Sequence, residues 1–135
     1  MVHLVLATHG TAAQGILSAA ELICGKQKNI STISLTPSMG AEMFGLELQK
    51  IISCVREEDE VLILTDIIGG TPTNQALGKY ANSKRVSILT GLNLPMLLEA
   101  IFERENKTAE ETSEICEKAG KDGIVNLRAN LIAMK

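Results

Sequence analysis

The sequence predicts an α/β fold with an open, doubly wound and mostly parallel sheet, strand order 2-1-3-4, and helices on both faces. One observation is that short apolar runs alternate with longer segments whose apolar residues recur at helical spacing. Another is that the apolar runs are almost continuous, as in VLIL within residues 61–65, which is typical of strands covered on both faces. The 135 residues, 45% of them hydrophobic, suffice for one core, so we expect a single domain over residues 1–135.

The expected elements alternate along most of the chain. Strands are expected at residues 2–7, 30–35, 61–65 and 86–89, and helices at about 12–24, 38–55, 72–81, 95–104 and 108–120. A last apolar run at residues 124–127 does not continue the alternation. We expect it to form an antiparallel strand at one edge of the sheet.

Residue types that favour helix starts support two of these boundaries. Thr11 with Gln14, and Thr108 with Glu111, have the spacing of a capping box, in which each side chain bonds the backbone N–H of the other. Gly15 costs its helix about 1 kcal/mol relative to alanine. Its lack of a side chain suggests a close approach of this helix to the sheet.

Composition excludes several classes of function. The net charge of −3 argues against nucleic acid as the main partner, and an aromatic content of 2% argues against stacking platforms for bases or sugars. The start MVHLVLATHG lacks the features of a signal peptide, and no apolar run is as long as a membrane span. We therefore expect a cytoplasmic protein with no direct membrane insertion.

Cys24, Cys54 and Cys116 are widely separated and are expected to be buried thiols.

The candidate site combines the residues that follow two strands. In doubly wound sheets the ligand crevice lies beyond the carboxyl ends of the strands, where the winding direction reverses. With strand order 2-1-3-4 the reversal falls between strands one and three, whose ends carry His9 and Asp66. A carboxylate that accepts a hydrogen bond from one imidazole nitrogen leaves the other as a nucleophile. His9 is therefore the predicted nucleophile, and Asp66 the group that orients it.

The segment DIIGGTPTNQA, residues 66–76, adds a predicted anion site. Gly69 and Gly70 can turn successive N–H groups toward one point, Thr71 is a suitable N-cap, and Pro72 suits the first helical position. A helix start with free N–H groups and a hydroxyl favours a phosphoryl group. Together with His9, this arrangement predicts phosphoryl transfer through a phosphohistidine.

Further residues complete the predicted site. Gly10, which follows the histidine, is included with the phosphate-binding residues, and Thr65, Met39 and Asn93 are candidates for lining the pocket. No metal is expected, because His9 and its carboxylate lack other ligands nearby in sequence. The transfer itself requires no cofactor.

The motifs THGTAAQGIL, AELICG, DIIGGTPTNQA and TGLNLPMLLE closely resemble the IIA component of the mannose/fructose-type sugar phosphotransferase system (PTS), over essentially the whole chain. The resemblance implies that His9 is phosphorylated on its outer nitrogen by phospho-HPr, the general phosphocarrier, while Asp66 orients the ring. The phosphoryl group then passes to a histidine or cysteine of a IIB component. Thr71 stands where the family usually has serine in its GGSP motif, and Ile68 where it often has an aromatic residue.

The resemblance also implies an assembly. Family dimers exchange a C-terminal strand, so the apolar run at residues 124–127 is expected to pair with a second subunit in a homodimer. Because the chain stops at Lys135 without a linker into a further domain, we expect IIB to be a separate protein.

Other functions fit parts of this pattern. A regulatory phosphoacceptor, related to domains of PTS-controlled transcription activators, would use the same histidine. Phosphoryl donors of dihydroxyacetone kinases typically have serine after the histidine, where this chain has Gly10. A histidine phosphatase would need an arginine in place of Thr8 and a second, downstream histidine, and none follows His9. A flavodoxin-like nucleotide-binding module would purify with a bound cofactor.

Overall fold

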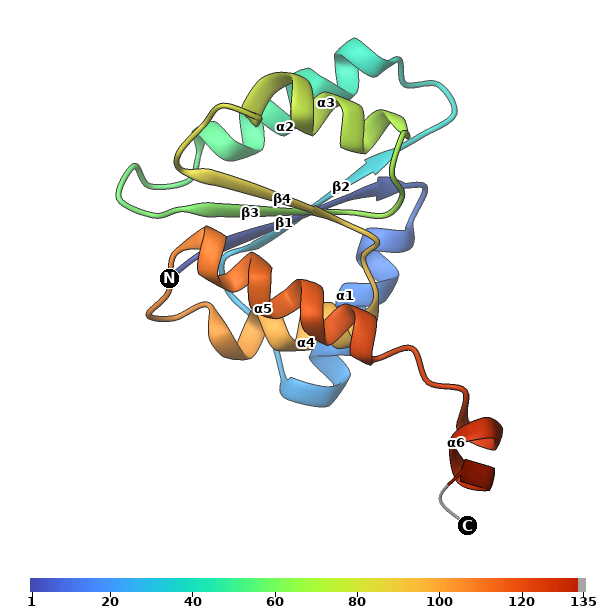
Figure 1. Ribbon diagram of the computed structural model, residues 1–135. Coiled ribbons are helices and arrows are strands. Elements are labelled where there is room, and N and C mark those ends of the chain that lie inside the picture. Colours follow the sequence, from blue (N-terminus) through green and yellow to red (C-terminus); the bar gives the residue numbers. More distant parts are fainter. Residues whose placement is uncertain (134–135) are drawn as a thin grey trace.

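A parallel sheet of four strands forms the middle layer of the computed structural model, which describes residues 1–133 (Figure 1). The strands are β1 (His3–His9), β2 (Ile30–Leu35), β3 (Val61–Thr65) and β4 (Val86–Thr90). Their order is β2-β1-β3-β4, and all three pairings are parallel. The predicted fold class and strand order are confirmed.

Helices cover both faces of the sheet. The helices are α1 (Ala12–Cys24), α2 (Ala41–Ser53), α3 (Thr71–Tyr80), α4 (Leu94–Glu103), α5 (Ala109–Asp122) and α6 (Leu127–Ala133). Figure 1 shows α2 and α3 on one face and α1, α4 and α5 on the other, while α6 lies apart from both layers. None of the helices formed by residues 1–133 combines the length and apolar character needed to cross a bilayer.

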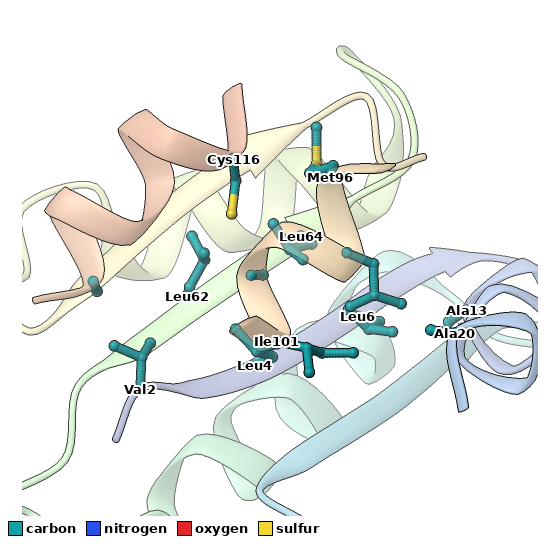
Figure 2. Packing of buried hydrophobic residues seen from close by; sticks show 13 residues of the cluster. Val2, Leu4, Leu6, Ala13, Ala20, Leu62, Leu64, Met96, Ile101 and Cys116 are labelled. Carbon is teal, nitrogen blue, oxygen red and sulfur yellow. The ribbon is translucent and has the colours of Figure 1, made fainter. Parts of the chain in front are cut away.

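The alternation of side chains along β1 divides the core into two halves. Leu4 and Leu6 are fully buried against α1, α4 and α5, in the cluster that Figure 2 shows. Val5 and Ala7 are equally buried on the opposite face, with Phe44 and Leu48 of α2. Because both faces bury apolar side chains, the sequences of β1 and β3 are almost continuously apolar.

The register of the strands sets the position of the candidate site. Ala7 of β1 pairs with Thr65, the last residue of β3, whereas β1 continues for two more residues beside β2. The end of β1 therefore projects beyond the end of β3. As a result, His9 lies beside the loop that begins with Asp66.

The two predicted capping boxes have different outcomes. Thr108 and Glu111 form the expected box at the start of α5, with hydrogen bonds of 3.0 Å and 2.9 Å. The box of Thr11 and Gln14 is wrong, because no side-chain cap bond is made by Thr11. Instead, the buried hydroxyl of Thr8 accepts the N–H of Ala13 at 2.9 Å. The end of β1 thus satisfies the first turn of α1.

The predicted strand at residues 124–127 is also wrong. Residues 124–126 have no regular structure, and Leu127 begins α6. Asn126 explains this local choice, because its side-chain oxygen accepts the N–H of Ala129 at 3.0 Å, as an N-cap does. A strand there would need to pair with an edge strand of the sheet, and within residues 1–133 no strand pairs with this segment. The predicted exchange of such a strand between subunits is therefore not shown.

Three local expectations are corrected as well. Helix α2 begins at Ala41 and not at residue 38, because Gly40 is its N-cap and the preceding residues form a turn. Of the three cysteines expected to be buried, Cys116 is buried and Cys24 is partly buried. Cys54, the C-cap of α2, is exposed. An added Cβ at Gly15 would meet no atom within 4 Å, so this glycine does not permit a close approach to the sheet.

Candidate functional site

His9 and Asp66 are hydrogen-bonded to each other at the carboxyl edge of the sheet. The ring Nδ1 of His9 lies 2.9 Å from Oδ2 of Asp66, and the backbone N–H of His9 donates to the same oxygen, also at 2.9 Å. The second carboxylate oxygen, Oδ1, accepts the N–H of Ile67 at 3.0 Å. Asp66 therefore holds both the backbone and the ring of His9 in one orientation.

The charge of this pair follows from the same contacts. Burial pushes the pKa of Asp66 upward, but the hydrogen bonds donated by the backbone and ring of His9 outweigh it and hold that pKa below its ordinary value. The carboxylate is thus ionised at neutral pH and can only accept hydrogen bonds. In the neutral imidazole of His9, the proton must then lie on Nδ1, and Nε2 has the free electron pair.

The imidazole of His9 packs against the start of α3. A Cβ built on Gly70 would lie 2.6 Å from Cε1 and 3.3 Å from Nε2 of the ring, so the glycine backbone is packed against the imidazole. Gly70 is the N-cap of α3, which begins beside the end of β1 (Figure 1). The N–H groups of a helix's first turn have no partners within the helix, and they favour anions. The free ring nitrogen therefore lies at a helix end suited to a phosphoryl group.

The predicted phosphate-binding residues occupy different places around this helix start. Thr71 is the first residue of α3 and not its N-cap, because Gly70 is extended and takes the capping position. Gly69 has φ +82°, a conformation that favours glycine, and it makes the turn into the helix. The N–H of Gly10 donates to Leu35 at 2.9 Å, continuing the pairing of β1 with β2. That N–H is therefore not free for a phosphoryl group.

The three predicted pocket residues lie in different parts of the fold. Thr65 is fully buried below the loop. Met39 packs with the core on the α2 and α3 face. Asn93 is the N-cap of α4: its side chain accepts the N–H of Met96 and donates to Gly120, both at 3.0 Å. Its polar atoms therefore serve two helices of the other face, which sequence position could not reveal.

Residues that the sequence analysis did not single out support the loop of Asp66. The hydroxyl of Thr73 donates to the carbonyl of Ile67 at 2.6 Å, and the side-chain amide of Asn74 donates to that of Gly69 at 3.3 Å. Both residues belong to the motif GGTPTN, so their position just after the helix start was a usable signal. Their partners lie only five or six residues earlier in the chain, in the loop that leads into α3.

The site is open to other molecules. The side chain of His9 is 48% exposed, so a second protein can reach Nε2. Ile67 and Ile68, directly after Asp66, are 56% and 78% exposed, which places an apolar surface beside the imidazole. Among residues 1–133, no group of three or more histidine, cysteine or acidic side chains is gathered as a metal site would require.

Comparison with known proteins relates this geometry to one family. Residues 3–117 match the family model EIIA-man, described as PTS system fructose IIA component. The chain is 30% identical over 106 residues to the PTS fructose-specific EIIA component of Bacillus subtilis, which covers 78% of this chain and 73% of that protein. It is 29% identical over 129 residues to the PTS mannose-specific EIIAB component of Escherichia coli K12. That match covers 95% of this chain, which spans only 40% of the E. coli protein.

Solved structures give the same relationship. The PTS component EIIA of Streptococcus agalactiae has a TM-score of 0.87 and 30% identity, with 96% of this chain and 99% of that chain covered. A PTS IIA protein associated with the fucose utilisation operon of Streptococcus pneumoniae has a TM-score of 0.86 and 31% identity, covering 97% and 99%. From the family match and these similarities, we conclude that the chain belongs to the family of PTS fructose IIA components.

Proposed function

We propose that this protein is a phosphoryl carrier of a sugar phosphotransferase system, which accepts phosphate from phospho-HPr on His9 and passes it to a IIB component during sugar uptake. The observation that carries the proposal is the 2.9 Å contact between Nδ1 of His9 and the Asp66 carboxylate. In the neutral ring this contact places the free electron pair on Nε2, on a half-exposed imidazole that packs against Gly70 at the start of α3. Membership of the IIA family supports the same chemistry.

The geometry accounts for a reversible transfer. Nε2 attacks the phosphorus of the donor's phosphohistidine, a new N–P bond forms, and the electron pair of the broken bond stays on the donor's imidazole. The His9 ring then carries a positive charge, which the ionised Asp66 stabilises. N–H groups of the first turn of α3 and the Thr71 hydroxyl would bind the phosphoryl oxygens. The second transfer repeats these steps with His9 as the leaving group.

The proposal is tested by phosphorylation in a reconstituted system. Purified protein is incubated with phosphoenolpyruvate, enzyme I and HPr, and the phosphorylated residue is located by mass spectrometry. One acid-labile, base-stable phosphate on His9 is expected, and His9→Ala should prevent labelling. The matched control is His3→Ala, because His3 is the chain's other histidine and starts β1 at the opposite end of the strand. Labelling that persists in His9→Ala would refute the assignment.

The second transfer separates uptake from regulation. A regulatory phosphoacceptor would be labelled on the same histidine but would not pass the group onward. A transport component should lose its label when IIB is added, and membranes holding the remaining components should then form sugar phosphate. This role also places the protein in the cytoplasm with HPr.

We further propose that the protein acts as a homodimer. Apolar side chains of the C-terminal segment are exposed in the single chain, with Ile124 at 80%, Leu127 at 76% and Leu131 at 59%. Contact with a second subunit would remove this surface from water. Sedimentation of the wild type and of Leu127→Asp tests the proposal: a dimer that dissociates in the variant is expected, and a monomeric wild type would contradict it.

A further inference from the structure

Three threonine hydroxyls from three different elements meet below the loop that begins with Asp66. Oγ1 of Thr73, on α3, lies 2.7 Å from Oγ1 of Thr65 on β3 and 3.4 Å from Oγ1 of Thr90 on β4. Thr65 is fully buried and Thr73 is 3% exposed, so neither hydroxyl can exchange this partner for bulk water. Buried polar groups of this kind are tightly constrained by their hydrogen bonds.

The directions of these hydrogen bonds follow from the chemistry of the groups. Thr73 also contacts the carbonyl of Ile67 at 2.6 Å, and a carbonyl can only accept. The single hydroxyl proton of Thr73 is therefore given to Ile67. Thr65 must then donate to Thr73, as must Thr90 through its longer contact. The three hydroxyls thus form a hydrogen-bonded set, and its last bond is donated to the carbonyl of Ile67 in the loop that begins with Asp66.

The set connects to His9 through the backbone of Ile67 and the carboxylate of Asp66. Ile67, whose carbonyl accepts from Thr73, donates its N–H to Oδ1 of Asp66 at 3.0 Å. Oδ2 of the same carboxylate accepts from Nδ1 of His9 at 2.9 Å. We propose that Thr73 is a positioning residue, which, supported by Thr65, fixes the Asp66 loop so that Asp66 keeps the His9 proton on Nδ1 and Nε2 free. The part of this inference that concerns the rate of phosphoryl transfer rests on the proposed function.

Three variants separate positioning from general stability. Thr73→Val keeps the volume and removes the hydroxyl, whereas Thr73→Ser keeps the hydroxyl. Thr112→Val is the matched control, because Thr112 is a fully buried threonine whose hydroxyl, within residues 1–133, bonds only the carbonyl of Thr108 at the start of its own helix (2.8 Å). If Thr73→Val does not fold, Thr65→Val removes the neighbouring hydroxyl and tests the same set.

Two readouts are used. The ¹⁵N spectrum of the His9 imidazole, taken at alkaline pH where the ring is neutral, reports which nitrogen carries the proton and requires no partner protein. We expect Nδ1–H in the wild type, Thr73→Ser and Thr112→Val, with a substantial population of Nε2–H in Thr73→Val. The single-turnover rate of transfer from phospho-HPr should fall about tenfold in Thr73→Val alone, because small displacements of a reacting group are costly. The half-saturating HPr concentration should not change, since buried Thr73 cannot touch HPr.

The outcomes are distinguishable. An unchanged tautomer and rate in Thr73→Val would overturn the inference, as would an equal loss of rate in Thr112→Val, which would trace the effect to stability. Absence of phosphorylation at His9 in the wild type would refute the proposed function instead. The tautomer measurement would still decide the role of Thr73 in that case.

Discussion

Gly70 and His9 pack against each other so closely that alanine at position 70 would place its Cβ 2.6 Å from Cε1 of the imidazole. The clashing atom is at the far end of a side chain, so the ring can swing away without displacing the backbone. Relief of the contact would move Nε2 away from the start of α3. Gly70 is therefore required by the geometry of the site more than by the stability of the fold.

Gly70→Ala should accordingly lower the rate of phosphoryl transfer by about 10–100-fold, with little change in the free energy of unfolding. Single-turnover transfer from phospho-HPr measures the rate, and denaturant unfolding measures stability. Gly78→Ala, also in α3 but with no atom within 4 Å of the added Cβ, is the matched control and should transfer normally. If Gly70→Ala transferred the phosphoryl group at the wild-type rate, the packing of the His9 imidazole against residue 70 would not be needed for transfer.

Asp66→Asn should slow transfer by about 10–100-fold while the protein remains folded. The amide can still hydrogen-bond, but it no longer compels Nδ1 to be the proton donor or stabilises a charged ring. Phosphorylation kinetics at neutral pH give the measurement. Rates equal to those of the wild type would contradict the orienting role of the carboxylate.

Ile68→Ser should weaken docking of the partner proteins and leave the chemistry intact. Ile68 is 78% exposed in the loop that begins with Asp66, so it can contribute apolar contact only when a partner covers it. We expect a several-fold rise in the half-saturating HPr concentration, roughly 1 kcal/mol in binding, with the maximal rate unchanged. Leu22→Ser, at an 89% exposed position near the end of α1, should have no effect.

Gly15→Ala should stabilise the protein by about 1 kcal/mol without altering transfer. Gly15 lies within α1, and an added Cβ there would meet open space, so only the gain in helix propensity remains. Denaturant unfolding of the two proteins provides the comparison. A loss of stability would mean that α1 needs the glycine for a contact outside the single chain.

His3 should make the protein sensitive to mild acid. Burial first, and the charge of Arg104 second, lower the pKa of His3 below its ordinary value of 6.5. As the pH falls below 6.5, His3 takes up a proton in the unfolded chain before it does so in the folded protein. The contribution of neutral His3 to the free energy of unfolding is therefore complete above pH 6.5, and it is lost as the pH falls toward the pKa of His3 in the folded protein.

His3→Gln should therefore show a smaller loss of stability between neutral and mildly acidic pH than the wild type. Urea unfolding at several pH values in this range gives the slopes. Equal slopes for the two proteins would rule out His3 as the group responsible.

The sequence by itself determined the class of the fold, the strand order and the pairing of His9 with Asp66. The fold class follows from local periodicity, and the pairing follows from the rule that strands of a doubly wound sheet end at one edge, with strands one and three meeting where the winding reverses. It also predicted an anion site at this helix start, with Thr71 as the N-cap, but Gly70 takes that position.

Only the tertiary structure decided which groups complete these local patterns. Thr8 caps α1 in place of Thr11, Asn93 joins α4 to α5, and the Thr73 hydroxyl reaches the backbone of Ile67. Residues 124–127 could not be assigned from their apolar pattern, because a strand requires an edge to pair with whereas a helix forms all its bonds within the segment. Hydrogen bonds between separate elements depend on how those elements pack, and a local sequence pattern does not reveal that packing.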